Sequence, residues 1–350
     1  MIEKNACNLI WTKARLVAMK LTTLRFPRLI AVLLFLLPAS VCLHAQDWAK
    51  TRLEASPRHR EYVSLKHGSR TVQALVVYPE IKTKAPVVIL IHEIFGLSDW
   101  AKEMADELAA QGFIVVAPDL LTGFGPNGGG SSEFPSQDAT MKAVSGLDKD
   151  VVNADLDAAA DYGKHLPAAD GKIAVAGFCW GGGKSFAFAT HRHDLSAAFV
   201  FYGPGPADVT TITAPVYGFY AGNDARIGAT VPATTEAMKA AGKKYEPVTY
   251  DGAGHGFMRA GEDPGNTVPG NKTARDESFK RLVMLINKAN SGSAGMRPMP
   301  THARPAPVRA ASAKTSPAPA SCHDEKTGAQ TSVQTATGDS MAVMDMSGGM

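Results

Sequence analysis

Runs of apolar, mostly β-branched residues recur between residues 61 and 252, and segments suited to helices separate most of them. Residues 61–80 alternate apolar and polar side chains around an HGSR turn, which predicts an antiparallel hairpin. Continuous runs such as APVVILIHE (85–93) and FIVVAPDLL (113–121) are typical of parallel strands buried on both faces. The pattern predicts an α/β fold, a doubly wound, mostly parallel sheet with helices on both faces.

Local signals predict where several connections begin and end. Ser98 or Asp99 can cap a helix through WAKEMADELAAQ, and Gly112 ends it. Residues 122–136 are rich in glycine and proline, which indicates a loop. A last helix is predicted over residues 273–288. In sheets of this kind ligands bind beyond the carboxyl ends of the strands, so residues that directly follow a strand are the candidates for a site.

The two ends of the chain differ in composition from the middle. Residues 1–45 contain basic residues, an apolar run of about 15 residues and a small-residue exit, the pattern of a secretory signal peptide, with Met19 as an alternative start. The run is shorter than the roughly 20 residues of a spanning helix, so we expect no stable membrane anchor and a periplasmic or extracellular protein. Residues 290–350 have the composition of a disordered tail, which leaves one domain over 46–289.

Charge and cysteine content exclude several classes of protein. The formal net charge of +3 over 350 residues indicates no nucleic-acid surface. After removal of the leader only Cys179 and Cys322 remain, so no disulfide framework is implied. The tail holds Cys322, His323 and several methionines, which could bind a soft metal, but no ligand spacing recurs. We expect no metal, no cofactor, a small-molecule partner and a monomer.

A cysteine stands among glycines in GFCWGGG, residues 177–183, between a predicted strand and a predicted helix. Gly177, Cys179 and Gly181 form the frame G-x-C-x-G, a nucleophile elbow with sulfur in place of the serine oxygen. Glycines suit this turn because strand and helix pass too close for side chains. The start of a helix also favours a thiolate. A structural cysteine beside a glycine-rich turn is the alternative.

Two further polar residues follow later strands in the order that an elbow requires, nucleophile, acid and histidine. Asp224 follows the strand APVYGFYAG, and His255 follows the strand YEPVTYDG. Each has an ordinary explanation alone, since aspartate is common in turns and a loop histidine is often solvated. Together with Cys179 they predict a Cys-Asp-His triad with His255 as general base.

The segment HEIFG, residues 92–96, directly follows the strand VVILI. Its main chain is placed to supply one oxyanion-hole N–H, from Ile94, and the residue after the nucleophile, Trp180, supplies the other. A carboxylate from Glu93 near the thiol would oppose thiolate formation unless it accepts the thiol proton. The alternative for Glu93 is an ordinary surface glutamate.

Over roughly residues 60 to 288 the chain resembles the dienelactone hydrolase family of α/β-hydrolases, also known as carboxymethylenebutenolidases. The motifs that carry the resemblance are IHEIFGL, VVAPDL, GFCWGG, FYG, AGNDARI and GAGHGFMR. HEIFG followed by GFCWGG is a specific combination. The resemblance implies an α/β-hydrolase fold and a lactone or ester substrate.

The resemblance also implies roles for single residues. The family's triad falls on Cys179, Asp224 and His255, and the glutamate that matches Glu93 contacts the resting thiol and helps to deprotonate it when substrate arrives. Of the two arginines that hold the substrate carboxylate in the best-known members, one matches Arg259. The stretch PDLLTGFGPNGGG, where the other is expected, holds no basic residue.

The sequence therefore predicts an exported hydrolase that cleaves a small lactone or ester through a thioester intermediate. Export departs from typical members, which act in the cytoplasm. A non-catalytic ligand-binding protein on an α/β-hydrolase scaffold is the alternative, because a fold does not fix a function.

Overall fold

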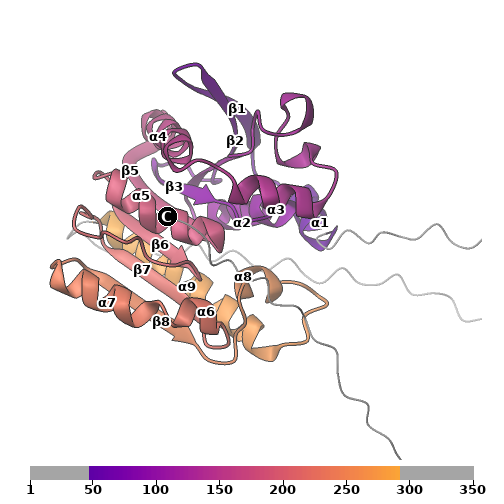
Figure 1. Ribbon diagram of the computed structural model, residues 1–350. Coiled ribbons are helices and arrows are strands. Elements are labelled where there is room, and N and C mark those ends of the chain that lie inside the picture. Colours follow the sequence, from indigo (N-terminus) through magenta and orange to yellow (C-terminus); the bar gives the residue numbers. More distant parts are fainter. Residues whose placement is uncertain (1–46, 292–350) are drawn as a thin grey trace, which may run out of the picture. The chain divides into compact units, whose positions relative to one another are not determined.

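The computed structural model describes residues 47–291, and its centre is one eight-stranded sheet with strand order β1-β2-β4-β3-β5-β6-β7-β8 (Figure 1). β1 and β2 form an antiparallel hairpin and β2 pairs antiparallel with β4, whereas the pairs from β4 to β8 are parallel. The predicted α/β fold and the hairpin are confirmed. The strands are β1 (Arg60–His67), β2 (Arg70–Val77), β3 (Ala85–Ile91), β4 (Ile114–Pro118), β5 (Ala169–Phe178), β6 (Ala197–Phe201), β7 (Val216–Ala221) and β8 (Tyr245–Tyr250).

Helices cover both faces of the sheet (Figure 1). Alternate residues of β3 explain its continuous apolar run, because Val88 and Leu90 belong to one core cluster and Ile89 and Ile91 to the other. Residues of α1, α2 and α9 lie in the first cluster, and residues of α4, α5 and α7 lie in the second. The helices are α1 (Asp47–Ala55), α2 (Asp99–Ala110), α3 (Gln137–Ser145), α4 (Lys149–His165), α5 (Trp180–His191), α6 (Ala225–Gly228), α7 (Val231–Ala240), α8 (Phe257–Ala260) and α9 (Pro269–Ser291).

The predicted helix boundaries agree with the structure in part. Ser98 is the N-cap of α2 and its hydroxyl accepts the N–H of Ala101 at 3.4 Å, while Gly112 follows the helix with a positive φ of 92°. The predicted last helix is longer than expected, from Pro269 to Ser291. Residues 122–136 form the predicted loop and contain two short 3₁₀ turns, and α3 after it was not predicted.

α1 was not predicted either, because it lacks the apolar stripe that marks an amphipathic helix. Ala49 is its one buried residue. The predicted leader, 1–45, lies outside the described residues, and so does the predicted tail beyond Ser291, so export and the disordered tail stay predictions. None of the helices in 47–291 combines the length and the apolar character needed to cross a membrane.

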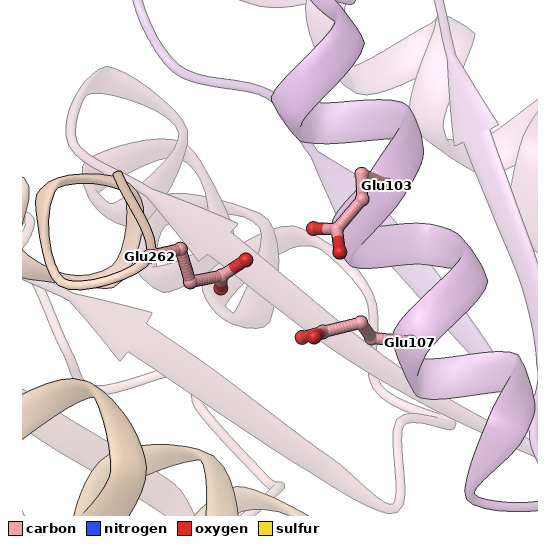
Figure 2. A group of neighbouring side chains, drawn as sticks. All are labelled: Glu103, Glu107 and Glu262. Atoms are coloured by element: carbon pink, nitrogen blue, oxygen red, sulfur yellow. The ribbon is translucent and has the colours of Figure 1, made fainter. Parts of the chain in front are cut away.

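A cluster of acidic and basic side chains joins α1, α2 and α9. Glu103 and Glu107 lie one turn apart on α2 and face Glu262, which lies between α8 and α9 (Figure 2). Arg52 of α1 lies 3.1 Å from the Glu262 carboxylate and 3.5 Å from that of Glu103. Arg275 of α9 binds Glu262 at 2.8 Å and also binds Glu107. Two guanidinium groups thus hold three carboxylates.

The cluster has one more carboxylate than guanidinium groups, and Glu103 is the carboxylate that takes up a proton. Its side chain is 4% exposed, and its Oε2 atom has no hydrogen-bond partner among the described residues. Burial, followed by the charges of Glu107 and Glu262, raises the pKa of Glu103 from 4.5 to about 10. A proton on Glu103 at neutral pH removes one of the three negative charges. Burial, followed by the charge of Glu262, also raises the pKa of Glu107 to about 7, so the two guanidinium groups face at most two carboxylates.

This proton makes the stability of the fold depend on pH. Between pH 4.5 and about 10 the folded chain keeps a proton on Glu103 that the unfolded chain releases, so the free energy of unfolding falls as the pH rises through that window. Glu103→Gln has nearly the shape of the protonated glutamate but cannot lose a proton. We expect it to stabilise the protein by about 1 to 2 kcal/mol at pH 9 and to have little effect at pH 4.5, measured by urea unfolding.

The exposed Glu54 of α1 gives the matched control, since Glu54→Gln removes a solvated charge near the same helix interface. It should leave the slope of stability against pH unchanged. Equal slopes for the wild type and Glu103→Gln would show that Glu103 is ionised in the folded protein.

Candidate active site

Cys179 occupies a sharp turn between β5 and α5. Its φ of 56° and ψ of −116° lie outside the conformations that side-chain-bearing residues usually adopt. The flanking glycines are required by contact: a Cβ atom on Gly177 would lie 1.9 Å from the carbonyl oxygen of Gly181, and one on Gly181 would lie 2.4 Å from that of His92. The glycines around the cysteine therefore let strand, turn and helix pass at backbone contact, as the elbow motif predicts.

The structure brings the three residues of the predicted triad together. Nε2 of His255 lies 3.1 Å from Sγ of Cys179, and Nδ1 of His255 lies 2.5 Å from a carboxylate oxygen of Asp224. Because a carboxylate only accepts, Nδ1 carries the proton and donates to Asp224, and Nε2 is free to accept the thiol proton. The other Asp224 oxygen accepts the N–H of Ile227 at 3.2 Å, which fixes the carboxylate at the start of α6.

The loops that carry Asp224 and His255 are bonded to each other. They follow the neighbouring parallel strands β7 and β8, so both emerge at the carboxyl edge of the sheet. The N–H of Asn223 donates to the carbonyl of Ala253 at 2.9 Å, and the N–H of Gly254 donates to the Asn271 side chain at 2.8 Å. These bonds hold the acid and the histidine in register.

Two backbone N–H groups converge on the sulfur of Cys179. They belong to Ile94, which follows β3, and to Trp180, the first residue of α5, and their hydrogen bonds lower the pKa of the thiol. These are the two groups that the sequence assigns to an oxyanion hole. In the resting structure both N–H groups act on the sulfur, since each lowers the pKa of the thiol.

The thiol is nevertheless un-ionised at neutral pH. Burial, followed by the negative charge of Glu93, raises the pKa of Cys179 from 9.0 to about 11, and the hydrogen bonds of Trp180 and Ile94 offset only part of this. The start of α5 alone was expected to favour a thiolate. Desolvation and the Glu93 carboxylate outweigh this effect of the helix. The position of Glu93 in the sequence had indicated that its charge would oppose a thiolate.

Glu93 is buried, so it is not a surface glutamate. One carboxylate oxygen accepts the guanidinium Nε–H of Arg259 at 2.9 Å, and the other accepts the hydroxyl of Tyr202 at 3.3 Å. The hydrogen bond of the thiol goes to His255 instead. The resting contact between Glu93 and the thiol that the family resemblance implies is thus replaced by an ion pair between Glu93 and Arg259.

Arg259 lies on α8 with its guanidinium 5.0 Å from the centre of the Phe95 ring. Its side chain is 29% exposed, so a ligand can reach it. The exposed Arg226 of α6, which the sequence did not single out, is also close enough to lower the pKa of Cys179. Within residues 47–291 the structure gives Arg226 no ion pair. The two guanidinium groups put positive charge around the thiol.

Tyr202 belongs to the FYG motif but was not among the predicted site residues. It is fully buried, has a φ of 38°, and lies edge-on to the His255 ring with 5.0 Å between the ring centres. Its hydroxyl also holds Glu93, so it contacts two of the predicted site residues. Its position in the sequence could have identified it, because Tyr202 directly follows β6, and β6 pairs with the strand that leads to Cys179.

The described part of the chain holds one group of three or more acidic, histidine or cysteine side chains close enough to share a metal ion, namely the Glu103, Glu107 and Glu262 cluster. Arg52 and Arg275 already hold these carboxylates in ion pairs, and none of the three is among the predicted site residues. Thus no metal is assigned to the cluster. The prediction of a cofactor-free protein stays a prediction.

Comparison with known proteins identifies relatives. The model of the dienelactone hydrolase family matches residues 72–290. A protein of Methylorubrum extorquens named "Putative carboxymethylenebutenolidase" is 33% identical over 186 residues, which cover 49% of this chain and 63% of that protein, less than two thirds of its length. The "Carboxymethylenebutenolidase" of Pseudomonas putida is 29% identical over 202 residues, which cover 55% of this chain and 83% of that protein.

Solved structures show the same fold. A structure titled "Putative Dienelactone Hydrolase" from Klebsiella pneumoniae aligns with a TM-score of 0.56 and 26% identity, covering 65% of this chain and 98% of that one. The match to the family model spans more than half of this chain and includes Cys179, Asp224 and His255. The chain belongs to the dienelactone hydrolase family.

Proposed function

We propose that the protein is an exported hydrolase that cleaves a small ester or lactone through Cys179. The observation that carries the proposal is the hydrogen-bonded series from Asp224 through His255 to the thiol, with distances of 2.5 and 3.1 Å. A nucleophile, a base and a group that orients the base are the parts that covalent acyl transfer requires. The names of the relatives, carboxymethylenebutenolidases, support a lactone substrate.

In the first half of the proposed reaction, the Cys179 sulfur attacks the substrate carbonyl while its proton moves to Nε2 of His255. A carbon–sulfur bond forms and the carbonyl oxygen becomes an oxyanion, which accepts hydrogen bonds from the N–H groups of Ile94 and Trp180, the two groups that lower the thiol pKa at rest. The carbon–oxygen bond then breaks, and the imidazolium returns the proton to the leaving oxygen. The product is a thioester.

In the second half, His255 removes a proton from water as the water attacks the thioester carbonyl. The carbon–sulfur bond breaks, the proton returns to sulfur, and a carboxylic acid leaves the site. Asp224 stays ionised and stabilises the imidazolium in both halves. A lactone thereby yields a hydroxy acid, and no redox partner is needed.

The ion pair between Arg259 and Glu93 suggests how an anionic substrate is recognised. Arg259 is bound to Glu93 at rest, and a substrate carboxylate would compete for the same guanidinium. The released Glu93 would then be free to turn toward the thiol, as the family resemblance implies. An acyl group that bears its own carboxylate therefore fits the proposal.

Removal of the sulfur tests the proposed nucleophile. Cys179→Ala should lower the hydrolysis of 4-nitrophenyl acetate and of a dienelactone by at least about 10³-fold, because no other described group lies in the elbow to form the acyl-enzyme. The assay compares purified variants with similar circular dichroism spectra. Undiminished turnover by Cys179→Ala would rule out the thioester route, and no turnover by the wild type would favour the non-catalytic binding protein.

Removal of the Arg259 guanidinium tests substrate charge. Arg259→Met should lower kcat/KM for an anionic dienelactone about 10- to 100-fold, the worth of one charge-assisted hydrogen bond, and should change the rate with neutral 4-nitrophenyl acetate much less. The neutral ester serves as the control for damage to the site. Equal losses on both substrates would show that Arg259 supports the site without binding the carboxylate.

Removal of the Glu93 charge tests the origin of the raised thiol pKa. Because the carboxylate raises the pKa of Cys179, Glu93→Gln should lower that pKa and increase the thiolate fraction at pH 8. We expect alkylation of Cys179 by iodoacetamide, followed by mass spectrometry of its peptide, to become about 3- to 10-fold faster. The control is Glu236→Gln, an exposed change on α7. A slower alkylation in Glu93→Gln contradicts the assignment.

A further inference from the structure

His92 is a fully buried residue beside the site that the proposed reaction does not use. It directly follows β3, and its Nδ1 atom lies 2.7 Å from the carbonyl oxygen of Glu93. A carbonyl oxygen can only accept, so Nδ1 carries a proton and donates it. The Nδ1–H group of His92 thus forms a hydrogen bond with the peptide unit that joins Glu93 to Ile94.

This peptide unit also holds one of the two N–H groups that lower the pKa of the Cys179 thiol. A trans peptide is planar, and its C=O and N–H bonds point in opposite directions. A hydrogen bond that fixes the direction of the Glu93 carbonyl therefore fixes the direction of the Ile94 N–H, the group that lowers the pKa of Cys179. Chains of hydrogen bonds also polarise one another, so the imidazole strengthens the Ile94 N–H as a donor.

The His92 ring also contacts the residue that carries the second N–H. It stacks on the Trp180 ring with 5.7 Å between the ring centres and 12° between the planes. The ammonium of Lys184 lies 5.1 Å from the centre of the same indole ring. The carbonyl of His92 packs against Gly181, where a Cβ atom would lie 2.4 Å from it. His92 thus contacts both residues that carry the two N–H donors: it is bonded to the peptide unit of Ile94 and it stacks on Trp180.

The other ring nitrogen of His92 defines the form of the imidazole. Nε2 is buried and has no hydrogen-bond partner among the described residues. Burial lowers the pKa of His92, so the ring is neutral, and the proton on Nδ1 leaves Nε2 bare. Among the described residues, the one hydrogen bond of the ring is therefore the bond from Nδ1 to the Glu93 carbonyl.

We propose that His92 is a positioning residue for the oxyanion hole, in which its Nδ1–H aims the Ile94 N–H through the Glu93 carbonyl and its ring holds Trp180. The inference rests on the proposed function, because it assumes that an oxyanion forms between these two N–H groups. His92 touches neither substrate nor sulfur in this role. It acts through the two backbone donors.

Two amide variants separate this role from a packing role. The side-chain nitrogen of His92→Asn takes the place of Nδ1 and can donate to the Glu93 carbonyl, whereas that of His92→Gln takes the place of Nε2 and cannot. Both variants put a similar polar group into the same site, so each is the control for the other. Thermal melting curves establish that both fold.

The expected result is a difference between the variants in kcat. His92→Gln should lose about 10- to 100-fold in kcat on 4-nitrophenyl acetate with KM within about threefold of the wild type, less than the loss of a whole oxyanion donor. His92→Asn should keep at least about a third of the wild-type kcat. The affinity of a trifluoromethyl ketone, which forms a tetrahedral oxyanion on cysteine, should fall by the same factor as kcat in each variant. Equal kcat values for the folded Asn and Gln variants would overturn the proposal.

A measurement without turnover keeps the inference separate from the proposed function. In protein labelled with ¹⁵N-histidine, the His92 ring should show a protonated Nδ1 and a bare Nε2 from pH 7 to 9, as distinguished by their nitrogen shifts. A proton on Nε2 would overturn the inference while the Cys179 chemistry stood. Full activity in Cys179→Ala would instead end the proposed function, whatever the state of His92.

Discussion

The site depends on backbone contact around the positive φ of Cys179. A non-glycine residue in such a conformation costs about 1 to 3 kcal/mol, so the surrounding structure must hold it there. The paired strands β3, β5 and β6 do so, because their carboxyl ends bring the elbow against the backbone that follows β3. The same contact places Ile94 beside the sulfur. The same backbone contacts therefore form both the turn at Cys179 and the proposed oxyanion hole.

The sequence predicted those parts of the molecule whose signal is local. The β-branched runs, the capping Ser98 and the glycines around Cys179 each reflect a constraint within a few residues, and the strand order that follows brings Asp224 and His255 to the thiol. Contacts between residues far apart in the chain could not be predicted from these local signals. The burial of Glu93, its ion pair with Arg259 and the contact of Tyr202 with both Glu93 and His255 depend on segments up to 166 residues apart.

The charges around Cys179 favour an un-ionised thiol in the resting protein. At rest the thiol is protonated, because its burial and the neighbouring Glu93 outweigh the N–H groups that favour a thiolate. A protonated thiol reacts slowly with electrophiles and oxidants, so the resting Cys179 is protected from both. Binding of an anion at Arg259 would change the charge balance around the thiol, so specificity and activation would arise from the same contact.

The hairpin at the start of the sheet determines where the folded unit begins. The family match starts at residue 72, inside β2, but all eight residues of β1 pair with β2, and Leu65 of β1 is buried in the core. A protein shortened to the matched region would turn β2 into an open edge strand and would expose Leu75 and its neighbours. Expression designs that follow the family boundaries would therefore produce an aggregating fragment, whereas those that begin at α1 keep both the edge strand and the Arg52 ion pairs.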